Sequence, residues 1–223
     1  MLLEFPEAYQ GIGYLQGSSL ILWLISIGIF FTSFVLFFLK ASKLEMKSQK
    51  KIFQGYGIFS LFFGITRIIF IIGVYIPEQY DFYTTLGYIT GILGILYWLY
   101  VIETYLITNT KKIFMIITSV AFGIALIALI GQASRYFALM LIYILLPFAI
   151  VAIFMLYIYL IIKTTGIVRK RTIWLVIGLV ILVIGYIMDT ELFVGNFRWI
   201  PLEISPALMI LGTLIFIITQ LKE

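Results

Sequence analysis

Residues 17–39 read GSSLILWLISIGIFFTSFVLFFL, a run that contains no charged side chain. The hydrocarbon core of a bilayer is about 30 Å thick, and an α-helix needs roughly 20 mostly apolar residues to cross it. The run meets this length, and Lys40 follows it directly. The stretch therefore predicts a transmembrane helix that ends where the first basic residues begin.

Further runs of the same kind fill almost the whole chain, and together they predict spans at 17–39, 53–76, 83–107, 113–131, 137–162, 173–193 and 200–221. A helix satisfies its own backbone hydrogen bonds in lipid, whereas lipid-exposed coil does not. The residue alternation typical of a membrane β-barrel is absent. We therefore expect an all-α integral membrane protein, a seven-transmembrane helix bundle. Residues 1–223 form one domain, because the longest predicted connection, near 41–52, is too short for a soluble domain.

The composition excludes most catalytic chemistry. Hydrophobic residues make up 63% of the 223 residues and charged residues 11%, whereas soluble domains carry about 25% charged residues. The chain has no cysteine and no histidine, which excludes disulfides, histidine-ligated haem, the usual zinc sites and Ser-His or Cys-His nucleophiles. Only a metal site built from carboxylates alone stays open. We therefore expect a protein that is not an enzyme and has no cofactor or metal.

The distribution of basic residues predicts the orientation. Twelve of them follow the first, third, fifth and last spans: Lys40, Lys43, Lys47, Lys50, Lys51, Lys111, Lys112, Lys163, Arg169, Lys170, Arg171 and Lys222. The opposite side has only Arg135 and Arg198. Short basic connections stay in the cytoplasm, so we expect the N-terminus outside and the C-terminus in the cytoplasm. The net charge of +5 then faces anionic lipid headgroups, and no nucleic-acid partner is expected.

One charge lies deep inside a predicted span. Arg67 is about 14 residues from the start of the second span, near 21 Å from its inner edge. An isolated charge at that depth costs at least about 2.5–3.5 kcal/mol, so a partner is expected. Asp189 lies at about 24 Å by the same count, and Glu191 and Glu203 lie at similar levels. We predict an ionic cluster of these four residues in the outer leaflet, with Arg67 paired to Asp189 or Glu203.

This cluster has two interpretations of about equal weight. In the first, it only holds the second, sixth and seventh spans together. In the second, it lies beside an outer-half cavity and binds an anion, a polar ligand or a proton, because charges inside membranes are often functional. Pro147 and Pro206 favour the second interpretation, since proline bends a helix and opens space beside it. Pro201 fits the first turn of the last helix.

Glu103 lies about one turn from the inner end of the third span. The simpler interpretation is an anchor at the membrane surface, neutralised by Lys111, Lys112 or Lys163. The alternative is a cytoplasmic gate or a contact for a partner protein.

Small residues recur at helix-packing spacing. Gly87 and Gly91 are four apart, as are Ser60 and Gly64, and Gly178 and Gly185 are seven apart on one face. Such spacing lets two helix backbones approach closely. We expect packing within the chain, with a homodimer face as the alternative.

Aromatic side chains are numerous, with 15 tyrosines and four tryptophans. The tryptophans lie mostly near predicted span ends, as in an aromatic belt: Trp23, Trp98, Trp174 and Trp199. The third span is rich in rings, which we interpret as packing and interface anchors: Tyr88, Tyr97, Trp98, Tyr100 and Tyr105. A pocket for an apolar ligand is the alternative.

In its layout the chain is similar to rhodopsins and G-protein-coupled receptors, which also have seven helices and an external N-terminus. It lacks the lysine that retinal proteins carry in the last span, since residues 200–221 contain none. The receptor triplet at the end of the third helix is matched only in part by Glu103-Thr104-Tyr105, where threonine replaces the arginine. The similarity is therefore one of topology and implies no shared function.

These observations favour a receptor-like or sensor-like protein that binds a small ligand near Arg67 and acts through a separate cytoplasmic or membrane protein partner. A transporter or channel for small solutes or protons is the first alternative. A non-catalytic accessory subunit of a membrane complex is the second, and an intramembrane hydrolase is the least favoured. The abundance of isoleucine, phenylalanine, tyrosine and lysine is compatible with a prokaryotic plasma membrane.

Overall fold

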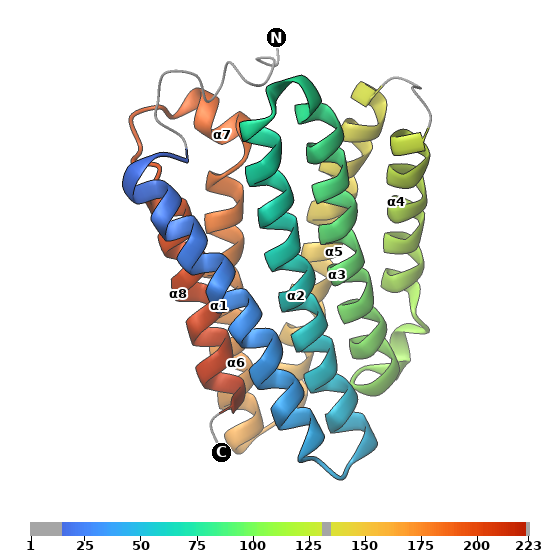
Figure 1. The fold of residues 1–223 in the computed structure, drawn as a ribbon. Helices are drawn as coiled ribbons and strands as arrows, with labels where there is room; N and C mark the ends of the chain where they lie inside the picture. The colour runs from blue at the N-terminus through green and yellow to red at the C-terminus, as the bar shows by residue number, and fades with distance from the viewer. Residues whose placement is uncertain (1–14, 131–134, 222–223) are drawn as a thin grey trace.

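The computed structural model describes residues 15–130 and 135–221, and in these ranges the chain forms helices and no strand. The α-helices are α1 (Gly17–Ser42), α2 (Lys47–Tyr75), α3 (Tyr80–Tyr105), α4 (Ile113–Ile130), α5 (Arg135–Lys163), α6 (Gly166–Met188), α7 (Glu191–Asn196) and α8 (Ile204–Leu221). Two short 3₁₀ turns, Pro77–Gln79 and Thr108–Thr110, precede α3 and α4. Figure 1 shows the long helices running side by side along one bundle axis.

Six of these helices are long and apolar enough to cross a membrane, namely α1, α2, α3, α5, α6 and α8. The apolar part of α4, Ile113–Ile127, is shorter. Large apolar side chains also point away from the bundle, among them Ile127, 68% exposed, and Ile162, 73% exposed. Such a surface fits lipid tails rather than water. The chain is therefore an all-α, multi-pass membrane protein that contacts the bilayer, while the seventh span and the orientation stay predictions.

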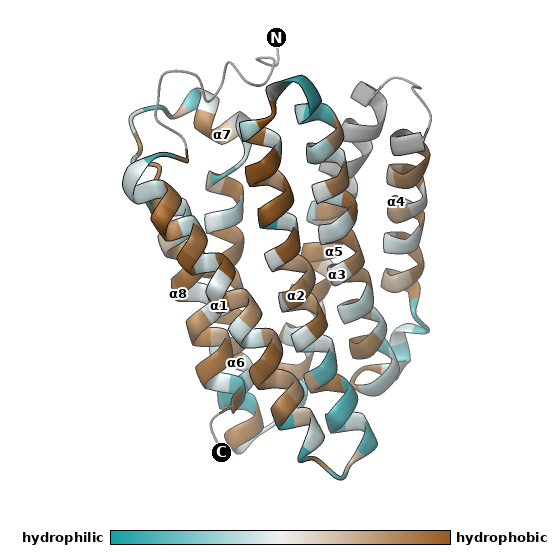
Figure 2. Ribbon diagram, in the orientation of Figure 1, coloured by the Kyte–Doolittle hydropathy of each residue, from teal (hydrophilic) through white to brown (hydrophobic). Residues whose placement is uncertain are grey.

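The long helices form a closed ring. Each of α1 to α6 packs against its neighbour in sequence, α3 also contacts α5, and α8 packs against both α6 and α1. The connections α1–α2, α3–α4 and α5–α6 lie at one end of the bundle (Figure 1), which carries most of the lysines and arginines and which we call the basic end. Figure 2 shows hydrophilic residues gathered at the ends of the bundle and hydrophobic ones along the helices between them.

Glycines set the closest helix contacts. A Cβ built on Gly212 would lie 2.6 Å from the carbonyl oxygen of Gly178, and one on Gly185 would lie 2.9 Å from the carbonyl oxygen of Ser205. The backbones of α6 and α8 therefore touch along the face that Gly178 and Gly185 share. Gly64 of α2 also faces a neighbouring helix, because a Cβ built on it would lie 3.3 Å from the Cβ of Phe30 in α1. The predicted packing of these glycines within the chain is confirmed.

The last two predicted spans differ from the observed helices. The span expected at 173–193 ends at Met188, because Asp189 caps α6 and Thr190 starts the short helix α7 by accepting the backbone N–H of Phe193. The span expected at 200–221 begins at Ile204. Pro201 thus precedes the helix and Pro206 lies in its first turn, where a missing N–H breaks no helical hydrogen bond. The bend expected at Pro206 was therefore wrong.

At the basic end, polar residues extend a helix beyond its apolar core. The second span was expected to start at 53, but α2 starts at Lys47. Lysine is a good helix former, and its chain stays in water while the helix continues. Pro147 lies inside α5, as the sequence indicated.

Candidate functional site

The structure buries Arg67 and gives it a carboxylate partner. Arg67 lies in α2 and is 2% exposed, and its Nη1 donates to Oδ2 of Asp189, the residue that caps α6. The Asp189 side chain is 9% exposed. The guanidinium is thus sheltered from lipid and paired with an acid from a distant part of the chain, so the ion pair links α2 to the end of α6.

The other two acids of the predicted cluster do not complete it. Oε1 of Glu203 accepts a hydrogen bond from the Ser18 hydroxyl at 2.7 Å, and Glu203 forms no ion pair with Arg67. The prediction that Arg67 pairs with Asp189 or Glu203 is thus confirmed for Asp189, whereas Glu203 lies in the connection before α8, which starts at Ile204. The bond from Ser18, with a hydrogen bond from its own backbone, holds the pKa of the Glu203 carboxyl below its usual value. The Glu191 side chain lies outside the part of the chain that the structure describes.

Three aromatic rings surround the Arg67 guanidinium. Its Cζ lies 4.7 Å from the ring centre of Trp23, 5.0 Å from that of Tyr186 and 5.7 Å from that of Phe70. A cation over the face of a ring is attracted to it, most strongly where water is excluded. Trp23 is only 2% exposed, so it is part of this site and not the interface anchor that the sequence suggested.

Several buried polar atoms of α1 and α2 have no hydrogen-bond partner in the described structure. They are Arg67 Nε and Nη2, Trp23 Nε1, and the hydroxyl oxygens of Ser19 and Ser26. Buried polar groups are nearly always satisfied. Their gathering on two adjacent helices, α1 and α2, therefore distinguishes this region from the rest of the core.

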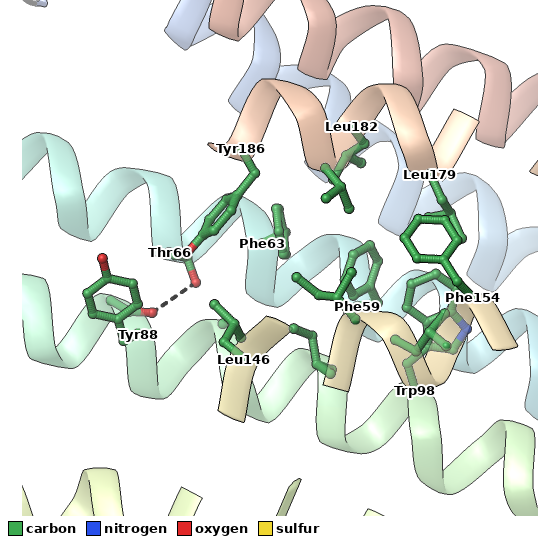
Figure 3. A pocket seen from close by; sticks show the side chains of 16 residues that line it. Phe59, Phe63, Thr66, Tyr88, Trp98, Leu146, Phe154, Leu179, Leu182 and Tyr186 are labelled. Atoms are coloured by element: carbon green, nitrogen blue, oxygen red, sulfur yellow. Dashed lines mark hydrogen bonds between the residues drawn. The ribbon is translucent and has the colours of Figure 1, made fainter. Parts of the chain in front are cut away.

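A cavity of about 50 Å³ lies at the centre of the bundle between α2, α3, α5 and α6 (Figure 3). Its lining is almost wholly apolar and consists of Phe59, Phe63, Thr66, Gly87, Tyr88, Gly91, Ile95, Trp98, Leu146, Ile150, Ile153, Phe154, Leu179, Leu182, Val183 and Tyr186. The Thr66 hydroxyl is bonded to the carbonyl oxygens of Phe62 and Gly87. Because the Tyr186 ring lines this central cavity and also packs on the Arg67 guanidinium, the cavity and the ion pair share a wall.

Toward the basic end, aromatic side chains close the central cavity. Trp98 Nε1 donates to the Tyr157 hydroxyl at 3.2 Å, and that hydroxyl donates to Tyr56 at 3.3 Å. The Phe216 ring lies 5.1 Å from Tyr56 and 5.2 Å from Phe37, measured between ring centres. All five residues are buried. Helices α1, α2, α3, α5 and α8 thus meet in a packed aromatic layer below the cavity.

A second, smaller cavity of about 20 Å³ lies at the opposite end of the bundle. Asp189 and Ser205 line it together with residues of α7 and of the connection to α8. The Ser205 hydroxyl donates to the carbonyl oxygen of Gly185. Asp189 therefore faces both Arg67 and a space near the bundle surface.

Glu103 has a role that the sequence did not suggest. It is 1% exposed, and its carboxylate accepts the backbone N–H of Met115 at 2.7 Å and that of Phe114 at 3.4 Å. A carboxylate at a helix N-terminus satisfies unpaired N–H groups and is stabilised by the helix dipole. Glu103 of α3 thus caps α4, and the expectation of a surface anchor neutralised by lysine was wrong. A gating role stays a prediction.

Within the described ranges, no group of three or more aspartate, glutamate, histidine or cysteine side chains is placed to hold a metal ion. In comparisons with known proteins, no family model, curated protein or solved structure matches the chain.

Proposed function

We propose that the protein is a receptor-like or sensor-like seven-helix membrane protein that binds a small ligand in the central cavity beside the Arg67–Asp189 pair. In this proposal α1 to α6 and α8 cross the bilayer, with the N-terminus outside and the C-terminus in the cytoplasm of a prokaryotic cell. The observation that carries it is an apolar cavity inside the bundle whose Tyr186 wall packs on a buried ion pair. The basic end supports the orientation, because short basic connections stay in the cytoplasm.

The size and lining of the central cavity favour a small, mainly apolar ligand. Unfilled space in a protein core costs roughly 24 cal/mol per Å³, so about 50 Å³ corresponds to about 1 kcal/mol that a ligand can recover by filling it. The few polar groups at its wall, such as the Thr66 hydroxyl, suit orientation of a ligand rather than strong polar binding.

Transport is supported less well than sensing. A solute path needs polar groups or space through both halves of the bundle, and the layer of Tyr56, Trp98 and Tyr157 fills the half toward the basic end. A ligand in the cavity touches α2, α3, α5 and α6 at once. Its binding therefore favours a particular arrangement of these helices, which a cytoplasmic or membrane protein partner can recognise.

We propose no catalytic role. The Asp189 carboxylate forms an ion pair with Arg67, and this contact accounts for its burial without acid–base chemistry. The proposal also needs no cofactor.

The central cavity can be tested by filling it. Val183 lines it from α6, whereas Val180, one turn away, is 41% exposed on the outer surface. Thermal unfolding of the purified protein in lipid nanodiscs would be followed with a panel of small alkanes, alcohols and carboxylic acids. We expect at least one compound to raise the Tm of the wild type and of Val180→Phe but not of Val183→Phe.

Equal stabilisation of both variants, or no stabilisation of the wild type, would overturn the proposal. The same proteins in liposomes test the transporter alternative, because flux of a stabilising compound that is lost in Val183→Phe would favour transport. Co-purification of a stoichiometric membrane subunit would favour the accessory role.

A further inference from the structure

Arg67 uses only one of its three nitrogens. Asp189 accepts from Nη1, while Nε and Nη2 have no partner among residues 15–130 and 135–221, although Arg67 is 2% exposed. The N–H groups of Nε and Nη2 lie on the same edge of the planar guanidinium and point in parallel. This edge matches the two oxygens of a carboxylate, which arginine binds through two parallel hydrogen bonds.

Helix α1 also carries buried polar groups that have no partner in the described structure. The Trp23 ring packs on the guanidinium, and its Nε1, which can only donate, has no acceptor in the part of the chain that the structure describes. The hydroxyls of Ser33 and Ser60 are hydrogen bonded at 3.0 Å across α1 and α2. Ser26 lies seven residues before Ser33 in α1, and Arg67 lies seven residues after Ser60 in α2. Because α1 and α2 are antiparallel, both steps run about two turns in the same direction along the bundle. The backbones of Ser26 and Arg67 are therefore at about the same level of the bundle, and the buried Ser26 hydroxyl has no hydrogen-bond partner in the described structure.

The unpartnered groups define the chemistry of the missing partner. Arg67 Nε, Arg67 Nη2 and Trp23 Nε1 are donors only, and a serine hydroxyl can donate or accept. The site therefore offers donors to oxygen atoms that only accept. A carboxylate supplies two such oxygens at the spacing of the Arg67 edge, and Asp189 already occupies the remaining nitrogen.

We propose that Arg67, Trp23 and Ser26 bind the carboxylate of a short-chain carboxylic acid, with its alkyl chain in the central cavity. The placement of the alkyl chain in the cavity rests on the proposed function, whereas the binding of the carboxylate at Arg67 does not. The guanidinium lies next to the central cavity, because the Tyr186 ring packs on it and lines the cavity, while the Phe70 ring packs on it and on Tyr88 of the cavity lining. Asp189 accepts from Nη1 and lines the second, smaller cavity, and Nε and Nη2 have no partner within the described residues.

The test is binding of radiolabelled butanoate to the protein in nanodiscs of uncharged lipid. Unlabelled acetate to octanoate, and the amide of each acid, serve as competitors. We expect affinity to rise about fourfold per methylene until the cavity is full. Each amide should bind about tenfold or more weakly than its acid, because it loses a hydrogen bond between charged groups.

Two variants separate binding from folding. Arg67→Lys keeps a positive charge for Asp189 but removes the two-nitrogen edge, so butanoate affinity should fall about tenfold or more. Trp23→Phe keeps a ring on the guanidinium and removes only the N–H, so a smaller loss is expected. The matched control is Trp174→Phe, on the outer surface of α6 and 47% exposed, which should bind as the wild type does. If Arg67→Lys fails to fold, a loss of butanoate affinity in Trp23→Phe and Ser26→Ala tests the carboxylate site instead.

The outcomes distinguish the two proposals. Binding that depends on chain length but is equal for acids and amides, and is unchanged in Trp23→Phe and Ser26→Ala, would overturn the carboxylate site and leave the cavity ligand standing. In that case only water occupies the Arg67 edge. Acid-specific binding that ignores chain length and persists in Val183→Phe would support the carboxylate site and overturn the proposed function. No binding of any alkanoate would overturn the inference.

Discussion

Arg67 and Asp189 depend on each other because neither charge is solvated. Loss of one partner leaves the other as a buried, unpaired charge, which costs about 3–5 kcal/mol. We therefore expect Arg67→Met and Asp189→Leu each to destabilise the protein by about that amount. The double variant should be more stable than either single variant, since replacing a whole buried pair by apolar residues is often nearly neutral.

Chemical unfolding in mixed micelles would measure these stabilities, with Arg169→Met, at an exposed position of the basic end, as the control. Additive losses in the double variant would show that the two side chains do not act as a pair.

The sequence identified the pair but not its surroundings. A charge in an apolar span needs a partner, which is why Arg67 and Asp189 could be predicted. Glu203 was misplaced because its depth was counted from a helix start that the structure moves to Ile204. Trp23 was missed because tryptophan usually lies at membrane interfaces. The available signal was Ser19, Trp23 and Ser26, spaced along one face of an otherwise apolar helix.

At the scale of elements, Glu103 fixes the start of α4. Its carboxylate accepts two backbone N–H groups that have no partner within the helix. We expect Glu103→Ala to destabilise the protein by about 1–2 kcal/mol. Amide hydrogen exchange should rise at Phe114 and Met115. The adjacent Thr104→Ala is the control, because the buried Thr104 hydroxyl makes no hydrogen bond in the described structure and its loss should change neither measurement.

Helices α6 and α8 touch through glycine. A Cβ on Gly212 would lie 2.6 Å from the Gly178 carbonyl oxygen and 2.7 Å from the Leu182 nitrogen, both rigid backbone atoms. We expect Gly212→Ala to separate the helices and to destabilise the protein by about 1–3 kcal/mol. Gly123→Ala in α4 is the control, since its Cβ would meet no atom within 4 Å. There alanine should stabilise by up to about 1 kcal/mol. Thermal unfolding of both variants in the same detergent would decide, and equal Tm values would contradict the close contact.

Most helices could be predicted from charge-free runs, because length and hydropathy decide whether a segment crosses a bilayer. The short helix α7 could not. Residues 173–193 are apolar enough to continue a span, and the stop at Met188 depends on Thr190 capping a new helix and on Asp189 reaching Arg67 of another element. The end of α6 therefore depends on tertiary contacts, which a hydropathy profile does not describe.

For the whole molecule, the central cavity arises from the way the helices close the ring. Its lining comes from α2, α3, α5 and α6, and no single helix carries a pattern that predicts it. Two of the aromatic residues that the sequence suggested as a pocket alternative, Tyr88 and Trp98, do line it. The sequence could give candidates for the wall but not the shape, because a gap between packed helices depends on the sizes of all the facing side chains together.

The chain has no cysteine, so single cysteines can report the topology of the molecule without background labelling. With seven spans and an external N-terminus, a membrane-impermeant thiol reagent applied to intact cells should label Gln79→Cys. It should label Gln49→Cys only after the cells are opened. These two positions test orientation, because both are exposed and lie at opposite ends of the bundle.

Thr165→Cys then tests the number of spans. Thr165 is exposed in the connection between α5 and α6, beyond α4, whose apolar part is shorter than the other spans. If α4 crosses the bilayer, five crossings precede Thr165 and the position lies in the cytoplasm, protected in intact cells. If α4 does not cross, only four precede it and the position is labelled from outside. Labelling of Thr165→Cys and Gln79→Cys together in intact cells would thus contradict seven spans. It would also place Arg169, Lys170 and Arg171 on the external side, against the charge rule that predicts the orientation.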